Sequence, residues 1–268
     1  MQRRDQLVGT FRGFSSEQEL EKFEQLASLW WDEQGAFKHV HRFNRARLVP
    51  ILSGVCQHFS LPFVLDTPDK VQAALDAGDT PLEGLQILDI GCGGGLLSEP
   101  LARLGADVVA VDASANSISI AKARAQQQGL AIDYRQALAE SLLGSELRFD
   151  VVINAEVIEH VVAQQALVDC CAGLLKPQGV LVMATLNRSW LSYLIAVVGA
   201  EYVLGWLPKG THQWRSFVTP SELEQMMLAN QLSATHWLGL RYSLLSRCWR
   251  ESRSLAVNYM VLATPDQH

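Results

Sequence analysis

The chain has 268 residues, of which 49% are hydrophobic and 19% are charged, and its formal net charge is −6. This length and apolar content suit one α/β domain with extensions and a sizeable buried core. Because the chain is acidic and has no basic run, nucleic acid is a poor candidate partner. The five cysteines include no C-x-x-C pair and are odd in number. They disfavour a disulfide framework or a zinc knuckle and fit a reducing compartment.

The first 84 residues predict helices rather than a sheet. Residues 1–15 lack the apolar core of a secretory signal and are expected to form a disordered tail. Ser16 and Glu19 make a capping-box pattern that predicts a helix start, and a second helix is predicted over 43–58. Residues 61–83 contain three prolines and are interpreted as a lead-in. We therefore expect 16–84 to be an N-terminal helical region.

Residues 85–187 alternate short apolar runs with helical patterns. The predicted strands are 86–90, 107–111, 133–135, 149–154 and 180–185, and the predicted helices are 96–104, 114–128 and 162–174. Alternation of this kind predicts a doubly wound parallel sheet covered by helices.

The alternation stops after Asn187. Residues 188–218 are expected to form an insertion, and 219–268 the C-terminal part of the same domain. In that last part Thr219 is a candidate cap for a helix over 220–230, and closing strands are predicted over 232–240 and 256–263.

The most specific motif is a glycine-rich turn between the first strand and the first helix of the alternation. It reads Leu88-Asp89-Ile90-Gly91-Cys92-Gly93-Gly94-Gly95. Glycine allows a positive φ and a close approach of a ligand to the backbone. A ligand there would lie at the carboxyl end of the sheet, where doubly wound folds bind nucleotides.

Two cofactors compete for this turn. The dinucleotide fingerprint G-x-G-x-x-G requires a glycine where this chain has Leu96. Asp89, two residues before Gly91, would repel a pyrophosphate and instead suits a ligand that carries an ammonium and a sulfonium. Asp112 ends the second strand, where a carboxylate can accept both ribose hydroxyls of either cofactor. The turn therefore favours S-adenosylmethionine over NAD.

Several further segments closely resemble the ubiquinone-biosynthesis O-methyltransferases. In chain order they are Trp30-Trp31-Asp32, residues 41–47 (HRFNRAR), residues 156–160 (EVIEH), residues 185–188 (TLNR), residues 199–202 (GAEY), residues 208–212 (PKGTH) and Val257-Asn258-Tyr259. The resemblance runs from about residue 23 to residue 263. It implies the doubly wound, seven-stranded Rossmann-like fold of class I S-adenosylmethionine methyltransferases. It also implies methylation of polyprenylated catechol-type hydroxyls.

The resemblance carries site residues with it. Cofactor contacts are implied at Arg47, Gly91 and Asp112, and through the backbone at Ala155; Asp89 and Gly93 join them from the glycine motif. In part of the family a divalent metal binds the residues that match Glu156, Glu159 and His160, and Mg²⁺ is the metal we expect here.

The residues themselves are consistent with a metal but do not require one. If 156–160 form a helical turn, Glu156, Glu159 and His160 share one face, and such a set suits Mg²⁺, Mn²⁺ or Zn²⁺. The alternative is that the carboxylates only stabilise a helix N-terminus. His212 is the candidate general base, since histidine accepts a proton near neutral pH. Its alternative is a hydrogen-bonding surface histidine.

Residues 190–208 are apolar apart from Glu201 and are flanked by Arg188 and Lys209. We expect this segment to contact a membrane peripherally, which would match a polyprenyl substrate. One alternative is a lid packed over the sheet. A transmembrane helix is disfavoured, because the segment is marginal in length and carries Glu201, Gly199 and Gly205. Peripheral membrane contact, together with the family resemblance, implies a place on the inner membrane. The enzyme would lie on its reducing side (bacterial cytoplasm or mitochondrial matrix), with other ubiquinone-biosynthesis enzymes as candidate partners.

Three rival functions are kept: a methyltransferase for another small acceptor, an NAD-dependent oxidoreductase and a non-catalytic scaffold.

The chain departs from the family after Tyr242, where Ser243 and Leu244 replace an Asn-Pro sequence. The substrate pocket is expected to differ on that side.

Overall fold

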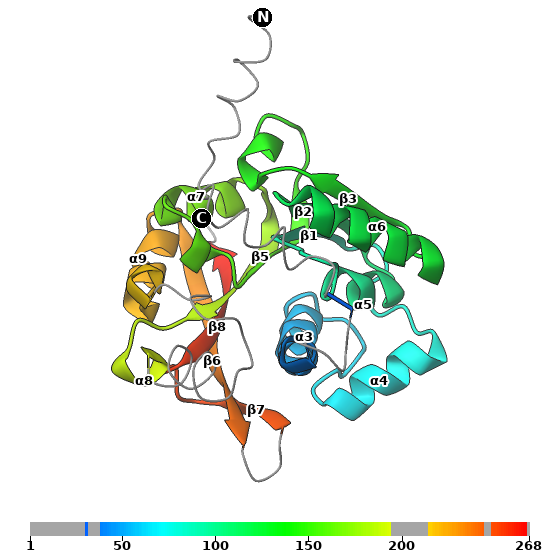
Figure 1. The fold of residues 1–268 in the computed structure, drawn as a ribbon, viewed down its shortest axis with the longest axis horizontal. Coiled ribbons are helices and arrows are strands. Elements are labelled where there is room, and N and C mark those ends of the chain that lie inside the picture. The colour runs from blue at the N-terminus through cyan, green and yellow to red at the C-terminus, as the bar shows by residue number, and fades with distance from the viewer. Residues whose placement is uncertain (1–29, 32–37, 194–213, 244–247, 267–268) are drawn as a thin grey trace, which may run out of the picture.

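The computed structural model describes residues 30–31, 38–193, 214–243 and 248–266 (Figure 1). Its centre is an eight-stranded sheet in the order β3-β2-β1-β4-β5-β8-β6-β7. The strands are β1 Gln86–Ile90, β2 Asp107–Asp112, β3 Ile132–Gln136, β4 Phe149–Ala155, β5 Leu175–Leu186, β6 Leu232–Ser243, β7 Cys248–Ser252 and β8 Asn258–Pro265. β1 to β5 pair in parallel, whereas β8, β6 and β7 join antiparallel.

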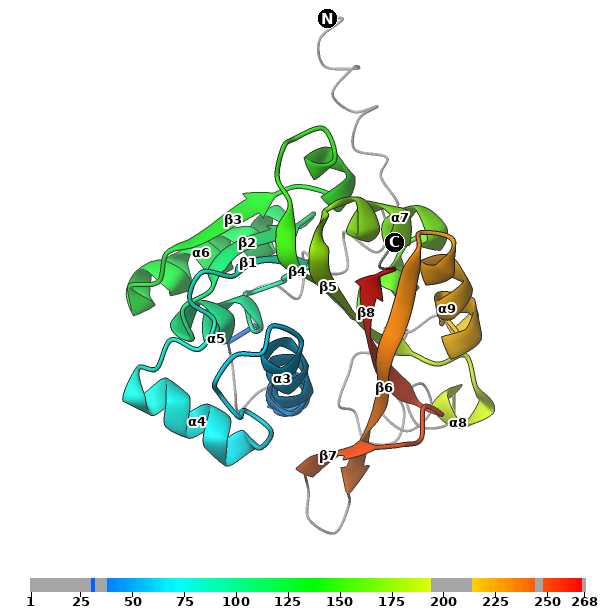
Figure 2. The ribbon, with the colours of Figure 1, turned by 180° about the vertical axis from the view of Figure 1, so that it is seen from behind.

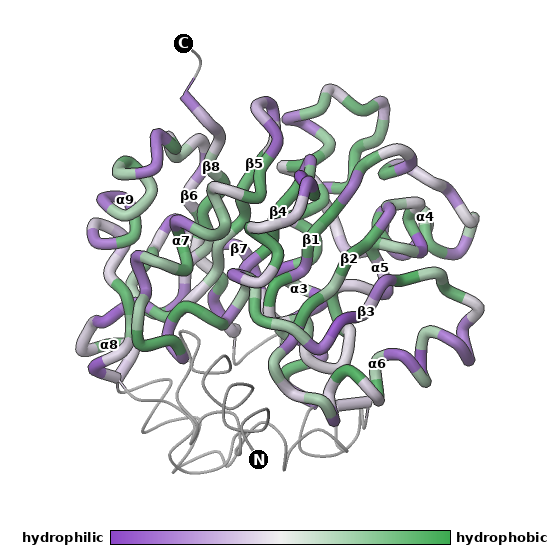
Figure 3. The backbone as a smooth tube through the Cα atoms, turned by 90° about the horizontal axis from the view of Figure 1, so that it is seen from above, coloured by the Kyte–Doolittle hydropathy of each residue, from purple (hydrophilic) through white to green (hydrophobic). Residues whose placement is uncertain are grey.

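Helices cover both faces of the sheet (Figures 1 and 2). One face carries α3 Lys38–His58, α4 Pro68–Ala77, α5 Ser98–Arg103 and α6 Ala115–Gln128; the other carries α7 Gln164–Gly173, α9 Pro220–Leu228 and the short turns η2 Ala139–Leu142 and η3 Ile158–His160. Because successive strand residues point to opposite faces, Leu88 and Val152 belong to the second layer while Ile87 and Val151 belong to the first. Strands covered on both faces need nearly continuous apolar sequence, as Figure 3 shows along the central strands.

The helix ends follow from local chemistry. Ser114 caps α6 by accepting a hydrogen bond from the Ser117 amide, and Gly129 ends that helix in the left-handed conformation. Thr219 and Glu222 form a capping box at the start of α9. These caps fix where each helix meets the adjoining loop, and α6 thereby begins immediately after the end of β2.

The predicted doubly wound fold is confirmed, with two additions. The sheet has eight strands rather than seven, because β7 pairs antiparallel with the outer half of β6. The lead-in over 61–83 contains helix α4, which is capped by Thr67, has Pro68 in its first turn and ends at Gly78. A proline in the first turn is compatible with a helix, so the prolines of this segment do not prevent α4.

Three predictions fall wholly or largely outside the described residues. They are the tail over 1–15, the helix from Ser16 and the segment 190–208. Of that last segment only the short α8 Trp190–Ser192 and the residue after it are described. In the part of the chain that the structure describes, no helix combines the length and the apolar character needed to cross a membrane.

Gly239 in β6 offers a test of the packing at the antiparallel end of the sheet. A Cβ at this position would lie 2.0 Å from the Ser254 carbonyl oxygen and 3.1 Å from that of Asn258. Backbone cannot give way as a side chain can, so Gly239→Ala should lower the free energy of unfolding by about 2 kcal/mol.

The matched control is Gly144→Ala, where a Cβ would meet nothing within 4 Å. It should stay within about 0.5 kcal/mol of the wild type. Chemical denaturation of both variants measures the difference, and equal stability would contradict the described packing of β6.

Candidate cofactor and active site

The glycine turn lies at the carboxyl edge of the parallel strands, directly after β1. Gly91 has φ +74° and its amide donates to the Val111 carbonyl of β2 over 2.8 Å. A Cβ at Gly91 would lie 2.3 Å from the Val157 side chain. Gly91 is therefore needed both for its backbone conformation and for the close approach of the segment that follows β4.

Asp112 ties this turn to the next one. One carboxylate oxygen accepts from the Gly93 amide over 2.9 Å, and the other accepts from the Ser114 amide over 2.8 Å. The β1–α5 turn and the β2–α6 turn are thus held at a fixed separation. A carboxylate oxygen has more than one acceptor position, so hydroxyl groups of a ligand can still bind Asp112.

Asp89 is a buried carboxylate beneath the turn. It is 2% exposed, and the Ser98 hydroxyl donates to it over 2.6 Å. Burial raises its pKa from 3.8 to about 6, against the opposing effects of the Ser98 bond and the Arg47 charge. A cationic ligand nearby would favour its ionised form.

Arg47 extends from α3 into the same region. Its Nε donates to Asn44 Oδ1 over 3.0 Å, and its Nη1 lies 3.9 Å from Glu156 Oε1. Burial lowers the pKa of Arg47, and the charges of Glu156, Asp89 and Glu159 oppose that shift. Nη1 makes no hydrogen bond with any described residue and can serve an anionic ligand.

Two carboxylates meet just after β4, which ends at the buried Ala155. Glu156 has φ +60°, unusual for a residue other than glycine, and its amide donates to the Ala184 carbonyl over 2.8 Å. Glu159 accepts from the Thr185 hydroxyl over 2.8 Å. Burial and the neighbouring Glu159 raise the pKa of Glu156.

The expected helical face over 156–160 is not formed. Glu156 is left-handed and precedes the single turn η3, so the spacing argument from an α-helix was wrong. In 38–193 and the other described ranges, no three His, Cys, Asp or Glu side chains are close enough to hold a metal ion. Of the predicted trio, the structure brings together Glu156 and Glu159, with His160 next in the chain. His212 lies outside the described residues.

An aromatic cluster continues the site away from the charged groups. The Phe43 and Trp249 rings are 4.7 Å apart, Trp249 and Tyr242 are 5.4 Å apart, and the Arg47 guanidinium lies 5.4 Å from the Phe43 ring centre. The sequence placed Phe43 in the 41–47 segment without a role in the site. It gave no signal for Trp249, because β7, which carries Trp249, has no alternating pattern. Tyr242, where the chain departs from the family pattern, belongs to this cluster.

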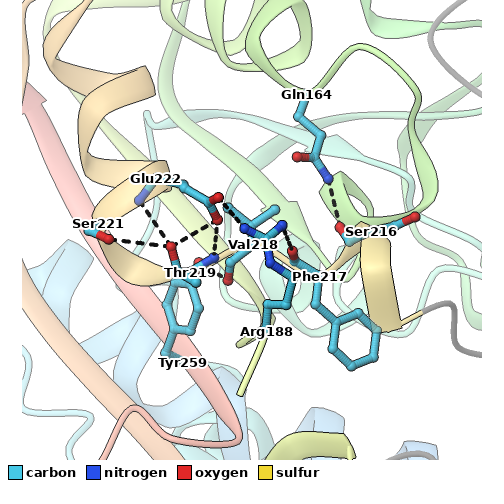
Figure 4. A network of polar contacts seen from close by, with 9 residues as sticks. All are labelled: Gln164, Arg188, Ser216, Phe217, Val218, Thr219, Ser221, Glu222 and Tyr259. Atoms are coloured by element: carbon cyan, nitrogen blue, oxygen red, sulfur yellow. Dashed lines mark hydrogen bonds and ion pairs between the residues drawn. The ribbon is translucent and has the colours of Figure 1, made fainter. Parts of the chain in front are cut away.

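A polar network fixes the chain on both sides of 194–213 (Figure 4). Arg188, beyond β5, is paired with Glu222 of α9 and donates to the Phe217 carbonyl over 3.1 Å. The Tyr259 hydroxyl donates to the Val218 carbonyl over 3.0 Å, and Gln164 donates to the Ser216 carbonyl over 2.7 Å. The stretch 214–219 is therefore anchored to α7, α9 and β8.

Known proteins that are similar to this chain are methyltransferases. Residues 65–236 match a family model described as a methyltransferase domain. The chain is 43% identical to a ubiquinone biosynthesis O-methyltransferase of Bartonella bacilliformis over 257 residues, which are 96% of this chain and 98% of the relative. It is 46% identical to that of Brucella ovis over 245 residues, which cover 91% and 94% of the two chains.

Solved structures share the fold at low identity. Magnesium protoporphyrin IX methyltransferase of Synechocystis, solved with bound SAH, is 20% identical with a TM-score of 0.52 over 74% of this chain and 81% of that one. An S-adenosylmethionine-dependent methyltransferase of Clostridium acetobutylicum is 15% identical with a TM-score of 0.52 over 74% and 89%. At these identities the similarity shows the fold alone.

The raised pKa of Asp89 predicts a pH-dependent stability in the cofactor-free protein. A carboxyl group whose pKa rises on folding stabilises the fold below its ordinary pKa of 3.8, and that contribution is lost as the pH rises through about 6. Asp89→Asn lacks this loss. As the pH rises from 3.8 to about 6, the free energy of unfolding of Asp89→Asn should therefore increase relative to that of the wild type. The difference should reach up to about 3 kcal/mol, at about 1.4 kcal/mol per pKa unit.

Urea denaturation at a series of pH values measures this difference. Ser98→Ala is the companion variant: without the hydroxyl bond the pKa of Asp89 rises further, so the loss of stability should move to higher pH. Parallel pH profiles of the wild type and Asp89→Asn would contradict the buried, raised carboxyl group.

Proposed function

The chain belongs to the family of ubiquinone biosynthesis O-methyltransferases, and from that membership we propose that it methylates a phenolic oxygen of a polyprenylated catechol with S-adenosylmethionine. The observation that carries the proposal is the edge of the sheet where the glycine turn, Asp112, Asp89 and Arg47 meet. A methyltransferase for another small acceptor is the second candidate, because this edge binds the cofactor and does not define the acceptor.

The charges at this edge suit S-adenosylmethionine better than NAD. The buried Asp89 favours a cation, as the cofactor's sulfonium and ammonium groups provide, and would oppose a pyrophosphate. Arg47 Nη1 lies 3.9 Å from Glu156 Oε1 and makes no hydrogen bond to any described residue, so it can take the cofactor carboxylate. Asp112 can accept the ribose hydroxyls, and the backbone at Gly91, Gly93 and Ala155 completes the binding surface.

Methyl transfer is an in-line displacement. The acceptor oxygen forms a bond to the methyl carbon while the carbon–sulfur bond breaks. The electron pair of the broken bond stays on sulfur, which gives S-adenosylhomocysteine. The cofactor is already activated, so the protein chiefly has to align the two reactants. A phenol has a pKa of about 10, so its proton must pass to a base. His212 stays the predicted base, outside the described residues.

Divalent metal binding is a further part of the proposal. The paired carboxylates of Glu156 and Glu159, with Glu156 Oε1 buried and unbonded in the described residues, fit a cation such as Mg²⁺. Glu156 and Glu159 would hold it, while His160, the third predicted ligand, does not form a three-residue set with them in the described residues. Bound there, a divalent cation would lower the pKa of an acceptor phenol.

Membrane contact would bring the enzyme to a polyprenylated substrate. Trp190 is 75% and Leu191 47% exposed. The Trp190 ring contacts those of Tyr193 and Trp214, which border 194–213 on either side. Exposed aromatic and apolar side chains at one place support peripheral binding at a membrane interface. The site would then face the bilayer that holds the prenyl chain, on its reducing side, where the other enzymes of the pathway are candidate partners.

The test is transfer of labelled methyl from S-adenosylmethionine to a short-chain prenylated catechol, with Mg²⁺ and then with a chelator. We expect turnover with Mg²⁺ and a large loss of turnover with the chelator. Turnover that is the same with and without the chelator would support the methyltransferase activity and contradict the role of a divalent metal. Tight cofactor binding without turnover would favour another acceptor.

A pair of arginine variants serves as the control for this assay. Arg47→Gln should weaken S-adenosylmethionine binding roughly tenfold or more, because a charge-assisted pair is lost. Arg103→Gln removes an exposed arginine of α5 that bonds Gln128, and it should bind the cofactor as the wild type does. Equal losses in both variants would contradict the role of Arg47.

Liposome flotation tests the membrane contact. The double variant Trp190→Ser, Leu191→Ser should float with vesicles at least several-fold less than the wild type, because buried apolar area is what holds an interfacial segment. Val64→Ser removes a side chain that is 64% exposed between α3 and α4, and it should float normally. Unchanged flotation of the double variant would favour the alternative of a lid over the sheet.

A further inference from the structure

The Trp30 ring lies directly on the glycine turn. A Cβ on Gly93 would be 2.5 Å from Trp30 Cζ2, and one on Gly94 would be 2.5 Å from Trp30 Cγ. A side chain at either glycine would therefore occupy the space that the ring fills. The indole and the turn fit each other only because both positions are glycine.

Both indole N–H groups are used at this contact. Trp31 Nε1 donates to the Gly94 carbonyl over 2.9 Å, and Trp30 Nε1 donates to the Ser117 hydroxyl over 3.2 Å. Ser117 lies in the first turn of α6, where its amide is bonded to Ser114, the residue that also donates to Asp112. Trp30 thus spans from the β1–α5 turn to the β2–α6 turn, the two turns that Asp112 also joins.

Side chains of Arg124 and His41 contact Trp30 and Trp31. The Arg124 guanidinium lies 4.1 Å from the Trp31 ring centre, and Arg124 Nε is 3.3 Å from the buried Glu99 carboxylate. His41 Nε2 lies 2.8 Å from the Trp30 carbonyl oxygen. His41 of α3 and Arg124 of α6 therefore hold the dipeptide in place, and Glu99 of α5 pairs with Arg124.

We propose that Trp30 and Trp31 are positioning residues of the cofactor site. Trp30 sets the separation of the two turns that bind the cofactor, and Trp31 sets the orientation of the Gly94 peptide. The inference rests on the proposed function, which makes S-adenosylmethionine the ligand of these turns. Because coupling between two binding events is reciprocal, the bound cofactor should in turn stabilise the docked rings.

Titration calorimetry with S-adenosylmethionine tests the proposal, beginning with the wild type. Trp31→Phe keeps a ring and loses one N–H bond, so its Kd should rise about three- to tenfold. Trp30→Ala removes the spanning ring and should raise the Kd more than tenfold. Trp237→Phe is the control, because Trp237 packs on Tyr259 in the other layer. It should bind as the wild type does.

Two readouts separate positioning from general stability. Tryptophan fluorescence should change when cofactor binds to the wild type and to Trp237→Phe, and this change should shrink in Trp30→Phe. Arg124→Met should raise the Kd about two- to fivefold through the loss of the cation–π contact. The double variant Arg124→Met, Trp31→Ala should lose less than the losses of Arg124→Met and Trp31→Ala multiplied, because Arg124 acts through the Trp31 ring.

The outcomes are distinguishable. Wild-type affinity in Trp31→Phe and Arg124→Met, or a full fluorescence change in Trp30→Phe, would overturn the inference and leave the proposed function standing. A wild type that does not bind S-adenosylmethionine would overturn both. If Trp30→Ala does not fold, Trp31→Phe, Trp30→Phe and the double-variant cycle with Arg124→Met still test the inference.

Discussion

The site depends on one constraint, the close approach of other chain segments to the backbone after β1. Gly91 meets Val157 from beyond β4, and Gly93 and Gly94 meet Trp30 from before α3. A side chain at any of these positions would push apart elements that are distant in the sequence. The glycines thus do more than allow a positive φ: they let three segments converge on one edge of the sheet, where a ligand can contact them together.

The second constraint is the grouping of the Arg47 guanidinium with several carboxyl groups at this edge of the sheet. Arg47 on α3 faces carboxylates from the ends of two neighbouring strands, since Asp89 belongs to β1 and Glu156 and Glu159 follow β4. Removing one member of such a set leaves its partners buried without compensation, which costs more than the pair contributes when intact. Helix α3 is therefore positioned by these charges as well as by its apolar contacts with the sheet.

Features that depend on short-range pattern were the most predictable from the sequence. The strand 86–90, the turn after it and Asp112 at the end of β2 were all evident, because short continuous apolar runs and glycines are local signals. Strand β7 and the contacts of Trp249 were not, since β7 exists through its pairing with β6. The pairing of Glu156 with Arg47 was also missed: an i, i+3, i+4 argument assumes an α-helix, and the backbone here is left-handed at Glu156.

Glu156 joins two features that each cost folding free energy. A left-handed residue other than glycine costs about 1–3 kcal/mol, and a buried carboxylate oxygen without a hydrogen bond among the described residues adds to this. A glycine would relieve the first cost and remove the second, yet it would also remove the carboxylate that faces Arg47. The β4–β5 pairing and the bond from the Glu156 amide to Ala184 hold the strained conformation in place. The sheet thus enforces a costly backbone conformation at the residue whose carboxylate faces Arg47, and the pairing of these two side chains depends on that conformation.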